Sequence, residues 1–482
     1  MNYKMISYSI GRILLIEALL LAFPAAGALL YRDNTFTAFA ITIAMLVIAG
    51  TLAARKKPKK TQIYAKEGYV IVALCWILMS FFGAMPFFLS GYIPNFVDAF
   101  FETVSGFTTT GSTILTNIEA LPKSLHFWRA FTHWIGGMGI LVFVIAIMPK
   151  TESTSMHIMR AEVPGPTVGK LVSKLRASAR ILYGIYCVIS LIQIVLLKIG
   201  GMPLFDCITN TFSTAGTGGF GVLNDSIAGY NSVYAEMVIA VFMLLFGINF
   251  NLYYLIIIGH AKQALKSEEL RCYLGIVTGA VVIIALSLYG TAHSWGDAFR
   301  LSFFQVSSII TTTGFSTADY CNWPITSQFI IIILMFFGAC AGSTGGGIKI
   351  SRIMILVKSC ARDIKKAINP RSIETVKIDK QAVEEPVVRG VSVFFGMYMG
   401  VMAISIILVS LQGLDITSTV TSVITCLGNV GPGFSTICPS GNFAHFSVFS
   451  KIVLSFDMLA GRLELIPILM IFSPYAWSRK YN

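Results

Sequence analysis

Four short Thr/Gly segments, each placed after a hydrophobic stretch, constrain this chain more than any other feature. They are residues 108–113 (TTTGST), 216–221 (GTGGFG), 311–316 (TTTGFS) and 430–435 (VGPGFS). Glycine permits backbone torsions that other residues rarely adopt, and it leaves no side chain where two backbones come close. Four similar loops in one polypeptide therefore predict a four-fold arrangement around one central pore.

The composition places the chain in a membrane. Of its 482 residues, 55% are hydrophobic and 12% are charged, and the mean hydropathy is +0.75. A water-soluble domain keeps more charge on its surface. We therefore expect an all-α integral membrane protein with about ten transmembrane helices, several of which reach the roughly 20 residues that a span requires only with their flanking residues. The expected spans are residues 10–30, 36–53, 70–89, 141–148, 181–197, 238–258, 276–288, 329–337, 391–411 and 452–472. A removable signal peptide is the alternative for the first.

The basic residues predict the orientation of the chain. Most of the 36 Lys and Arg fall in the segments that are cytoplasmic if the amino terminus is cytoplasmic. This asymmetry predicts that both termini lie inside. Basic loops beside the anionic lipid of the inner leaflet also account for the net charge of +13. We see no basic patch interleaved with aromatic residues, so no nucleic-acid partner is expected.

An aspartate precedes each loop and opens a short apolar stretch. Asp98, Asp206, Asp297 and Asp415 stand 13, 13, 17 and 18 residues before the glycines Gly111, Gly219, Gly314 and Gly433. Aspartate is a favourable N-cap and complements the positive end of a helix dipole. We therefore expect four half-helices that enter from outside, the last two about one turn longer. Such re-entrant backbone is tolerated at membrane depth only where protein buries it or where it lines a water-filled path.

Each unit thus consists of a span, a half-helix, a loop and a second span, and the four central glycines are 108, 95 and 119 residues apart. We expect four pseudo-symmetric repeats around one pore, at residues 69–180, 181–271, 272–389 and 390–482. Residues 1–68 would form two extra amino-terminal spans and a basic loop. The alternative is that these Thr/Gly/Ser clusters are ordinary helix-packing or turn residues.

The loops offer ligands for a dehydrated monovalent cation. Such an ion needs several oxygen atoms at once, and backbone carbonyls from four segments supply them without fixed charge. Residues 217–221 (TGGFG) come closest to the TVGYG pattern of potassium-channel filters. The candidate potassium ligands, which are the metal site we predict, are Thr109, Thr110, Gly111, Thr217, Gly218, Gly219, Thr312, Thr313, Gly314, Val430, Gly431 and Gly433.

A glycine-rich stretch, residues 338–347 (GACAGSTGGG), interrupts the span that closes the third repeat. Glycine is a poor helix former, and the freed backbone groups need partners, so we predict a flexible constriction below the loops. A small-residue packing face is the alternative. A nucleotide-binding P-loop does not fit, because Ile348 stands where that motif requires Gly-Lys-Ser/Thr. The candidate gate residues are Gly342, Ser343, Thr344, Gly345, Gly346, Gly347, Lys349 and Arg462.

Arg462 is a permanent cation within the last span. An ionisable residue inside the membrane is a functional hypothesis by default. The alternative is a structural ion pair, for example with Asp457 or with a carboxylate of another repeat. Cys321 and Cys438 each follow a loop on the expected outer side, where either a disulfide or two free thiols would be compatible with the sequence.

The sequence gives little support for other classes of protein. The nine cysteines show no CxxC or Cys/His spacing, so a structural zinc site is not expected. Hydrolase elbows, metalloprotease motifs and dinucleotide fingerprints are missing, so we do not expect an enzyme. A secondary carrier with broken helices is a rival, but inverted repeats come in twos, whereas this chain repeats one orientation four times.

Five further motifs carry a family resemblance. They are residues 134–140 (WIGGMGI), 160–166 (RAEVPGP), 340–349 (CAGSTGGGIK), 429–433 (NVGPG) and 461–464 (GRLE). Together with the four loops, they make the chain resemble the Trk/Ktr/HKT superfamily of potassium transporters over nearly its whole length. The resemblance is greatest to the bacterial Trk-type membrane subunit.

This resemblance implies potassium uptake across the bacterial cytoplasmic (inner) membrane. In the family, serine at the first filter glycine goes with sodium permeation, so Gly111 implies potassium selectivity. Residues 340–349 resemble the intramembrane loop that gates the pore, and Arg462 matches an arginine that faces the path near that gate. Coupling of potassium to protons or sodium, as in a symporter, is the alternative to passive movement.

The resemblance also implies partners. The family's membrane subunits form homodimers and dock on a separate cytosolic regulatory subunit that binds NAD(H) or adenine nucleotides. We place that contact on the basic segments 149–180 and 349–389. No organic cofactor is expected on this chain.

Overall fold

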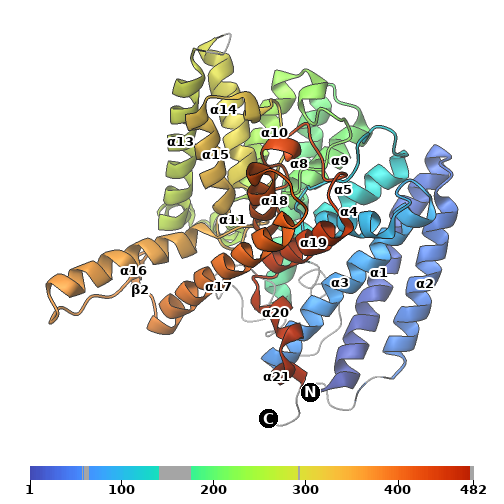
Figure 1. Ribbon diagram of the computed structural model, residues 1–482, viewed down its shortest axis with the longest axis horizontal. Helices are drawn as coiled ribbons and strands as arrows, with labels where there is room; N and C mark the ends of the chain where they lie inside the picture. Colours follow the sequence, from blue (N-terminus) through green and yellow to red (C-terminus); the bar gives the residue numbers. More distant parts are fainter. Residues whose placement is uncertain (57, 59–63, 140–174, 291–293, 478–482) are drawn as a thin grey trace.

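The computed structural model describes residues 1–56, 58, 64–139, 175–290 and 294–477. These residues are mostly helical, and the described sheet is one small hairpin of β1 (Lys377–Ile378) and β2 (Gln381–Ala382). The amino terminus and α21 (Pro474–Trp477), the last described helix, lie at the same end of the molecule, and the hairpin lies on an arm that projects from its side (Figure 1).

The two amino-terminal helices, α1 (Tyr3–Tyr31) and α2 (Phe36–Ala54), form a closely packed pair at one edge of the molecule (Figure 1). A Cβ added at Gly11 would overlap the Gly50 carbonyl and Ala54 N across the pair. Small residues let membrane helices approach backbone to backbone, which strengthens their van der Waals contact. The pair packs on the first repeat through α3 and α5.

The rest of the chain forms four units of the same plan, each a long helix, a short helix, a loop and a second helix. The first is α3 (Ala65–Leu89), α4 (Phe96–Phe107) and α5 (Lys123–Gly137); the second is α8 (Leu175–Ile199), α9 (Leu204–Gly216), α10 (Val233–Phe246) and α11 (Phe250–Ile257), followed by α12 (Ala261–Leu265). The third is α13 (Glu268–Leu288), α14 (Trp295–Ile310), α15 (Ile325–Phe336) and α16 (Ile350–Ile368); the fourth is α17 (Glu385–Ser410), α18 (Ile416–Gly428), α19 (Val448–Arg462), α20 (Ile466–Phe472) and α21 (Pro474–Trp477). Short 3₁₀ turns follow three of the loops: η1 (Ala228–Tyr230), η2 (Tyr320–Asn322) and η3 (Ser435–Ile437).

Among the described residues, six helices are long and apolar enough to span a membrane, and the bent pair α10 and α11 makes a seventh. The sequence predicts about ten spans, and the difference lies in helices that break. The expected span 238–258 bends by 90° between α10 and α11, 329–337 ends at the glycine-rich stretch, and 452–472 is interrupted between α19 and α20. The expected span 141–148 lies outside the described residues. The breaks thus fall in the second helix of a repeat.

The short helices that lead into the loops correct the expected role of the aspartates. Of the four, only Asp415 is an N-cap, where it accepts a hydrogen bond from Ser418 N. Asp98, Asp206 and Asp297 lie inside the first turn of α4, α9 and α14 instead. A carboxylate there still complements the helix dipole, which explains the recurrent aspartate. The extra turn is present in α14, with 16 residues, but α18 has 13, like α9.

Candidate functional site

The four loops share one backbone conformation. After each short helix one residue adopts the left-handed region: Thr109, Thr217, Thr312 and Asn429, with φ between 55° and 57°. Two residues later a glycine has φ between 77° and 100°: Gly111, Gly219, Gly314 and Gly431. Threonine rarely adopts positive φ, because its branched side chain crowds the backbone. Three strained threonines in equivalent places mark these loops as a functional site.

The same backbone hydrogen bond ends each of the four short helices. The residue after the left-handed one donates to a carbonyl five residues back: Thr110 N to Ser105 O at 2.9 Å, Gly218 N to Ser213 O at 2.8 Å, Thr313 N to Ser308 O at 2.8 Å and Val430 N to Thr425 O at 2.9 Å. This is the Schellman end of a helix, which satisfies carbonyls that would otherwise have no partner. The loops are therefore equivalent bond by bond.

This equivalence corrects the expected alignment of the fourth loop. Gly431, and not Gly433, matches the central glycines of the other loops in φ and in hydrogen bonding. Gly433 lies two residues further on, where an added Cβ would meet the side chains of Ile437 and Thr421. In the corrected alignment, Val430 stands where the other loops have Thr or Gly, and the four glycines are separated by 108, 95 and 117 residues.

The four loops close into a ring. A Cβ added at Gly111 would overlap the Gly218 carbonyl oxygen, and one at Gly219 would overlap that of Thr313. In the same sense, Gly314 faces the Val430 carbonyl and Gly431 faces that of Thr110. Each glycine thus makes room for a carbonyl of the next loop, and the fourth loop returns to the first. The ring brings four backbone carbonyls around one axis, which is the arrangement that replaces the water around a cation.

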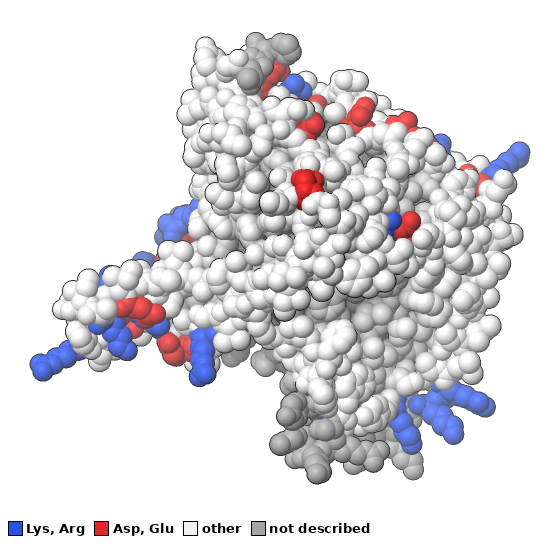
Figure 2. Space-filling view, in the orientation of Figure 1, with Lys and Arg blue, Asp and Glu red and all other residues white. Residues whose placement is uncertain are grey.

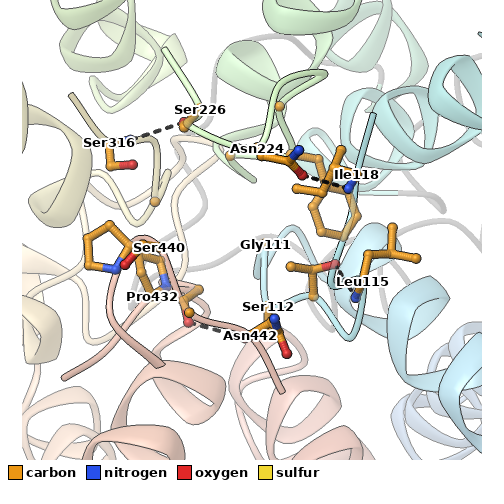
Figure 3. Close-up of a pocket in the computed structure, with 18 of the residues that line it drawn as sticks. Gly111, Ser112, Leu115, Ile118, Asn224, Ser226, Ser316, Pro432, Ser440 and Asn442 are labelled. Atoms are coloured by element: carbon orange, nitrogen blue, oxygen red, sulfur yellow. Dashed lines mark hydrogen bonds between the residues drawn. The ribbon is translucent and has the colours of Figure 1, made fainter. Parts of the chain in front are cut away.

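A pocket lies on one side of this ring. It measures about 110 Å³, and its walls include all four ring glycines together with residues that follow each loop. Figure 3 shows Gly111, Ser316, Pro432 and Asn224 around this pocket, with Asn224 from the second repeat bonded to Ile118 N of the first. The pocket is a water-accessible mouth above the ring.

On the opposite side of the ring, the glycine-rich stretch lies directly against the loops. Thr217 Oγ1 donates to the Thr344 carbonyl at 3.0 Å, and Gly346 N donates to Thr312 Oγ1 at 2.7 Å. An added Cβ at Gly346 would overlap Asn429 of the fourth loop. The left-handed residues of three loops therefore contact this stretch directly.

The breaks in neighbouring helices supply the partners that this irregular backbone needs. Cys340 N donates to the Gly247 carbonyl and Phe250 N donates to the Gly342 carbonyl, both at 3.0 Å, at the bend between α10 and α11. Glu269 of α13 accepts from Ala341 N at 2.7 Å and from Ser351 N at 3.2 Å. Non-helical backbone is stable at membrane depth only when it is satisfied in this way.

Arg462 joins the stretch to two other repeats. Its Nη1 donates to the Thr344 carbonyl at 2.8 Å, and its Nη2 donates to the Gly136 and Gly137 carbonyls at the end of α5. Asp457, the alternative partner, accepts a hydrogen bond from Ser405 Oγ at 2.6 Å. The guanidinium therefore crosses the space below the ring, from the fourth repeat to the first and third.

Lys349 folds back on the stretch that it ends. Its buried Nζ donates to the carbonyls of Gly345 and Gly346. Two cations, Lys349 and Arg462, thus hold the carbonyls of residues 344–346.

The predicted site residues form two layers, the ring and the stretch below it, with Gly433 outside both. Sequence reasoning missed Asn429, whose Nδ2 donates to Thr110 Oγ1 at 3.0 Å and to the Met458 carbonyl at 2.9 Å. It also missed Glu269. Asparagine tolerates the left-handed region, so an asparagine before Val-Gly at the end of a helix is the signal that would have identified the fourth loop.

The outer loops of the third and fourth repeats are joined covalently. Cys321 and Cys438 form a disulfide, with their Cα atoms 6.3 Å apart. Of the two alternatives left open by the sequence, the disulfide is therefore present. It links segments 117 residues apart in the chain.

Comparison with known proteins identifies similar chains over the full length. The family model TrkH, described as a cation transport protein, matches residues 33–481. The Trk system potassium uptake protein TrkH of Salmonella typhimurium is 34% identical over 486 residues, with 99% of this chain and 100% of that protein covered. The corresponding protein TrkG of Escherichia coli K12 is 31% identical, and the match covers 99% of both chains.

A solved structure agrees with the fold. The crystal structure of the potassium transporter TrkH from Vibrio parahaemolyticus superimposes with a TM-score of 0.90 at 31% sequence identity. The match covers 99% of this chain and 100% of that one.

Proposed function

Because this chain belongs to the TrkH family of cation transport proteins, we propose that it takes up potassium through the ring of four loops. The observation that carries the proposal is the closed ring of glycine and carbonyl contacts, with its mouth on the outer side. The relatives that it matches over their whole length are potassium uptake proteins, which are transporters and not enzymes.

Potassium binds, in this proposal, to the carbonyls of Thr110, Gly218, Thr313 and Val430. Potassium gives up its water more readily to several weak oxygen ligands than to one fixed charge, and carbonyls supply such ligands. Glycine at all four ring positions supports potassium over sodium, because any side chain there would displace a neighbouring carbonyl. The left-handed threonines lie one residue further in and supply the next set of oxygen atoms.

The glycine-rich stretch acts as the gate. It lies under the ring, and hydrogen bonds from Thr217, Arg462 and the helix bend hold it in place. Opening the path requires the Thr344 carbonyl to release Arg462 and Thr217. Since these are single hydrogen bonds, each worth on the order of 1–3 kcal/mol, a modest differential binding energy can move the stretch.

The chain is a bacterial membrane protein, and we place both termini on the cytoplasmic side of the inner membrane. Two observations support this orientation. The amino terminus and α21 lie at one end of the molecule, and Figure 2 shows Lys and Arg near that end and on the projecting arm. Cationic segments favour the cytoplasmic side.

The projecting arm, made of α16, the β1–β2 hairpin and the start of α17, is where a cytosolic regulatory subunit binding NAD(H) or adenine nucleotides would dock. It leads directly from the gate, because α16 begins one residue after Lys349. A partner that moves the arm therefore pulls on the stretch. The second expected contact, 149–180, lies mostly outside the described residues, and a homodimer of this chain completes the proposed assembly.

Rubidium uptake in a bacterial strain without its own potassium uptake systems tests the proposal. The wild-type chain, expressed with its cytosolic partner, should restore growth at low potassium and take up rubidium. Gly111→Ser should admit sodium, because the serine side chain displaces the Gly218 carbonyl. Wild-type protein that reaches the membrane with its partner and moves neither potassium nor rubidium would contradict the proposal.

A further inference from the structure

A buried ion pair connects the first two loops behind the ring. Arg129 of α5 and Glu102 of α4 are 2.6 Å apart, with side chains that are 2% and 0% exposed. Both side chains are buried in the protein, where a charge is costly unless it is paired. Because buried ion pairs often contribute little to stability, stability alone does not explain this pair.

Glu102 binds the segment of chain that follows the first loop. Its carboxylate accepts from Thr113 Oγ1 at 3.0 Å and from Ile114 N at 3.0 Å, besides the bond from Arg129 Nε. Thr113 lies two residues after Gly111. The carboxylate therefore fixes the backbone that leaves the ring.

Arg129 binds the second loop at the equivalent position, two residues after the ring glycine. Its Nη1 donates to the Gly221 carbonyl at 3.1 Å, and Gly221 lies two residues after Gly219. The guanidinium also stacks on the ring of Phe220, 3.6 Å from its centroid, and His133 stacks on Phe220 as well, with ring centroids 4.1 Å apart. Cations stack favourably on aromatic rings when both are shielded from water.

The pair is a departure from the four-fold plan. The position nine residues before the ring glycine is Glu102 in the first repeat, but Asn210, Gln305 and Ser422 in the others. These three make neutral bonds within their own repeats: to Tyr230 Oη, to the Ala318 carbonyl and to the Thr419 carbonyl. Only at the first position does this site hold a charge and reach, through Arg129, into the next loop.

We propose that the Glu102–Arg129 pair is a positioning element that sets the separation of the first two loops and thereby the cation selectivity of the ring. The inference rests on the proposed function of the ring. Gly111 faces the Gly218 carbonyl at this junction, so any change in the loop separation alters the oxygen cage. Charge-assisted bonds are shorter and stronger than neutral ones, which suits them to fix a separation.

Two substitutions weaken the pair in different ways. E102Q removes the charge and the full acceptor capacity of the carboxylate. R129K keeps a cation beside Glu102, so the buried site stays neutral overall, but one ammonium cannot reproduce the fork that binds Glu102 and Gly221 together. R129K should therefore reach the membrane even where E102Q does not.

E236Q is the matched control. Glu236 also pairs with an arginine of another segment, Arg300, at 2.7 Å, and its side chain is 7% exposed. That pair joins the first turn of α10 to the start of α14, where Arg300 also binds Asp297 at 3.1 Å. Arg300 lies 14 residues before Gly314, whereas Glu102 and Arg129 bind residues that adjoin the ring. Loss of stability without loss of selectivity is the expected result for this control.

The experiment measures the ratio of rubidium to sodium uptake in the potassium-uptake-deficient strain, with the partner subunit present and protein levels matched. We expect E102Q to lower the ratio by about tenfold, which corresponds to about 1.4 kcal/mol, and R129K to lower it by about threefold or more. E236Q should retain the wild-type ratio. A wild-type ratio in R129K or E102Q protein that is inserted and active overturns the proposal, as does an equal loss in E236Q. Absence of uptake by the wild type would instead count against the proposed function.

Discussion

The ring and the stretch below it are built on opposite principles. The ring repeats one backbone pattern four times, and its contacts depend on the absence of side chains at four glycines. The stretch occurs in one repeat, and polar side chains hold it: Arg462 and Glu269 from other segments, and Lys349 from the residues that follow it directly. In the ring, one loop cannot move without its neighbours, because each glycine contacts a carbonyl of the next loop. In the stretch, individual side-chain hydrogen bonds can break and form with other partners. In the proposed function, selectivity depends on the first kind of structure and gating on the second.

Substitutions of ring glycines should give the largest effects. Gly219→Ala and Gly314→Ala should each lower rubidium uptake by roughly tenfold to 100-fold, because positive φ and steric overlap each cost on the order of 1–3 kcal/mol. Gly396→Ala in α17 is the matched control, since an added Cβ there meets no atom within 4 Å. Uptake measured at equal membrane levels distinguishes the two kinds of position. Equal losses in all three variants would argue against a special role of the ring.

The fourth loop allows a sharper test within one segment. Gly431→Ala should reduce uptake severely, because its Cβ would press on the Thr110 carbonyl and its φ is 100°. Gly433→Ala should reduce uptake less, since its Cβ would meet the movable side chain of Ile437. The same uptake assay ranks the two variants. If Gly433→Ala proved the more damaging, Gly433, and not Gly431, would be the ring glycine of the fourth loop.

Substitution of Arg462, the proposed gate arginine, should have an effect of intermediate size, and it should raise uptake where the glycine variants lower it. Arg462→Met removes the bonds to Thr344, Gly136 and Gly137, so uptake without the partner subunit should rise several-fold, as expected for a loss of about 1–2 kcal/mol of closed-state stabilisation. The ratio of rubidium to sodium uptake should stay near that of the wild type. Arg371→Ala, at an exposed cation on the arm, serves as the control. If uptake without the partner subunit were unchanged in Arg462→Met, Arg462 would not be part of the gate.

Loss of the disulfide should have the smallest effect on transport. Cys321→Ser with Cys438→Ser should lower the thermal unfolding temperature of the purified protein, because the bond closes a long segment of chain and such bonds typically contribute about 2–4 kcal/mol. Selectivity should change little, since the ring contacts between the third and fourth loops are made by backbone. A large change in selectivity without a change in unfolding temperature would assign the disulfide to the ring itself.

Much of the ring was predictable, because the constraint on it is local. Threonine and glycine clusters after a short apolar stretch, repeated at a similar spacing, predict the three loops at Gly111, Gly219 and Gly314. The fourth loop was aligned wrongly because Gly433-Phe434 resembles Gly314-Phe315, while the backbone follows Asn429 and Gly431. The side chains of that loop differ from those of the other three, whereas its backbone geometry is the same.

The parts that escaped prediction depend on contacts between distant segments. The pair of Glu102 with Arg129 and the bonds from Glu269 to residues 341 and 351 join elements whose proximity no local pattern encodes. The glycines of residues 338–347 predict the break in the third repeat, but hydropathy predicts continuous spans at 238–258 and 452–472, which also break. Hydropathy reports composition and not the partners that a bend finds. Three aspartates were placed at the N-cap because their dipole preference extends over the whole first turn.

Anomalous scattering from crystals of the protein soaked in thallium or rubidium salts would locate the ion itself. We expect a density peak on the axis of the ring, coordinated by the carbonyls of Thr110, Gly218, Thr313 and Val430. The peak should weaken or move in Gly111→Ser. A protein with an intact ring but no peak within it, or with its strongest peak beside a carboxylate such as Asp457, would contradict the claim that these four loops select the ion.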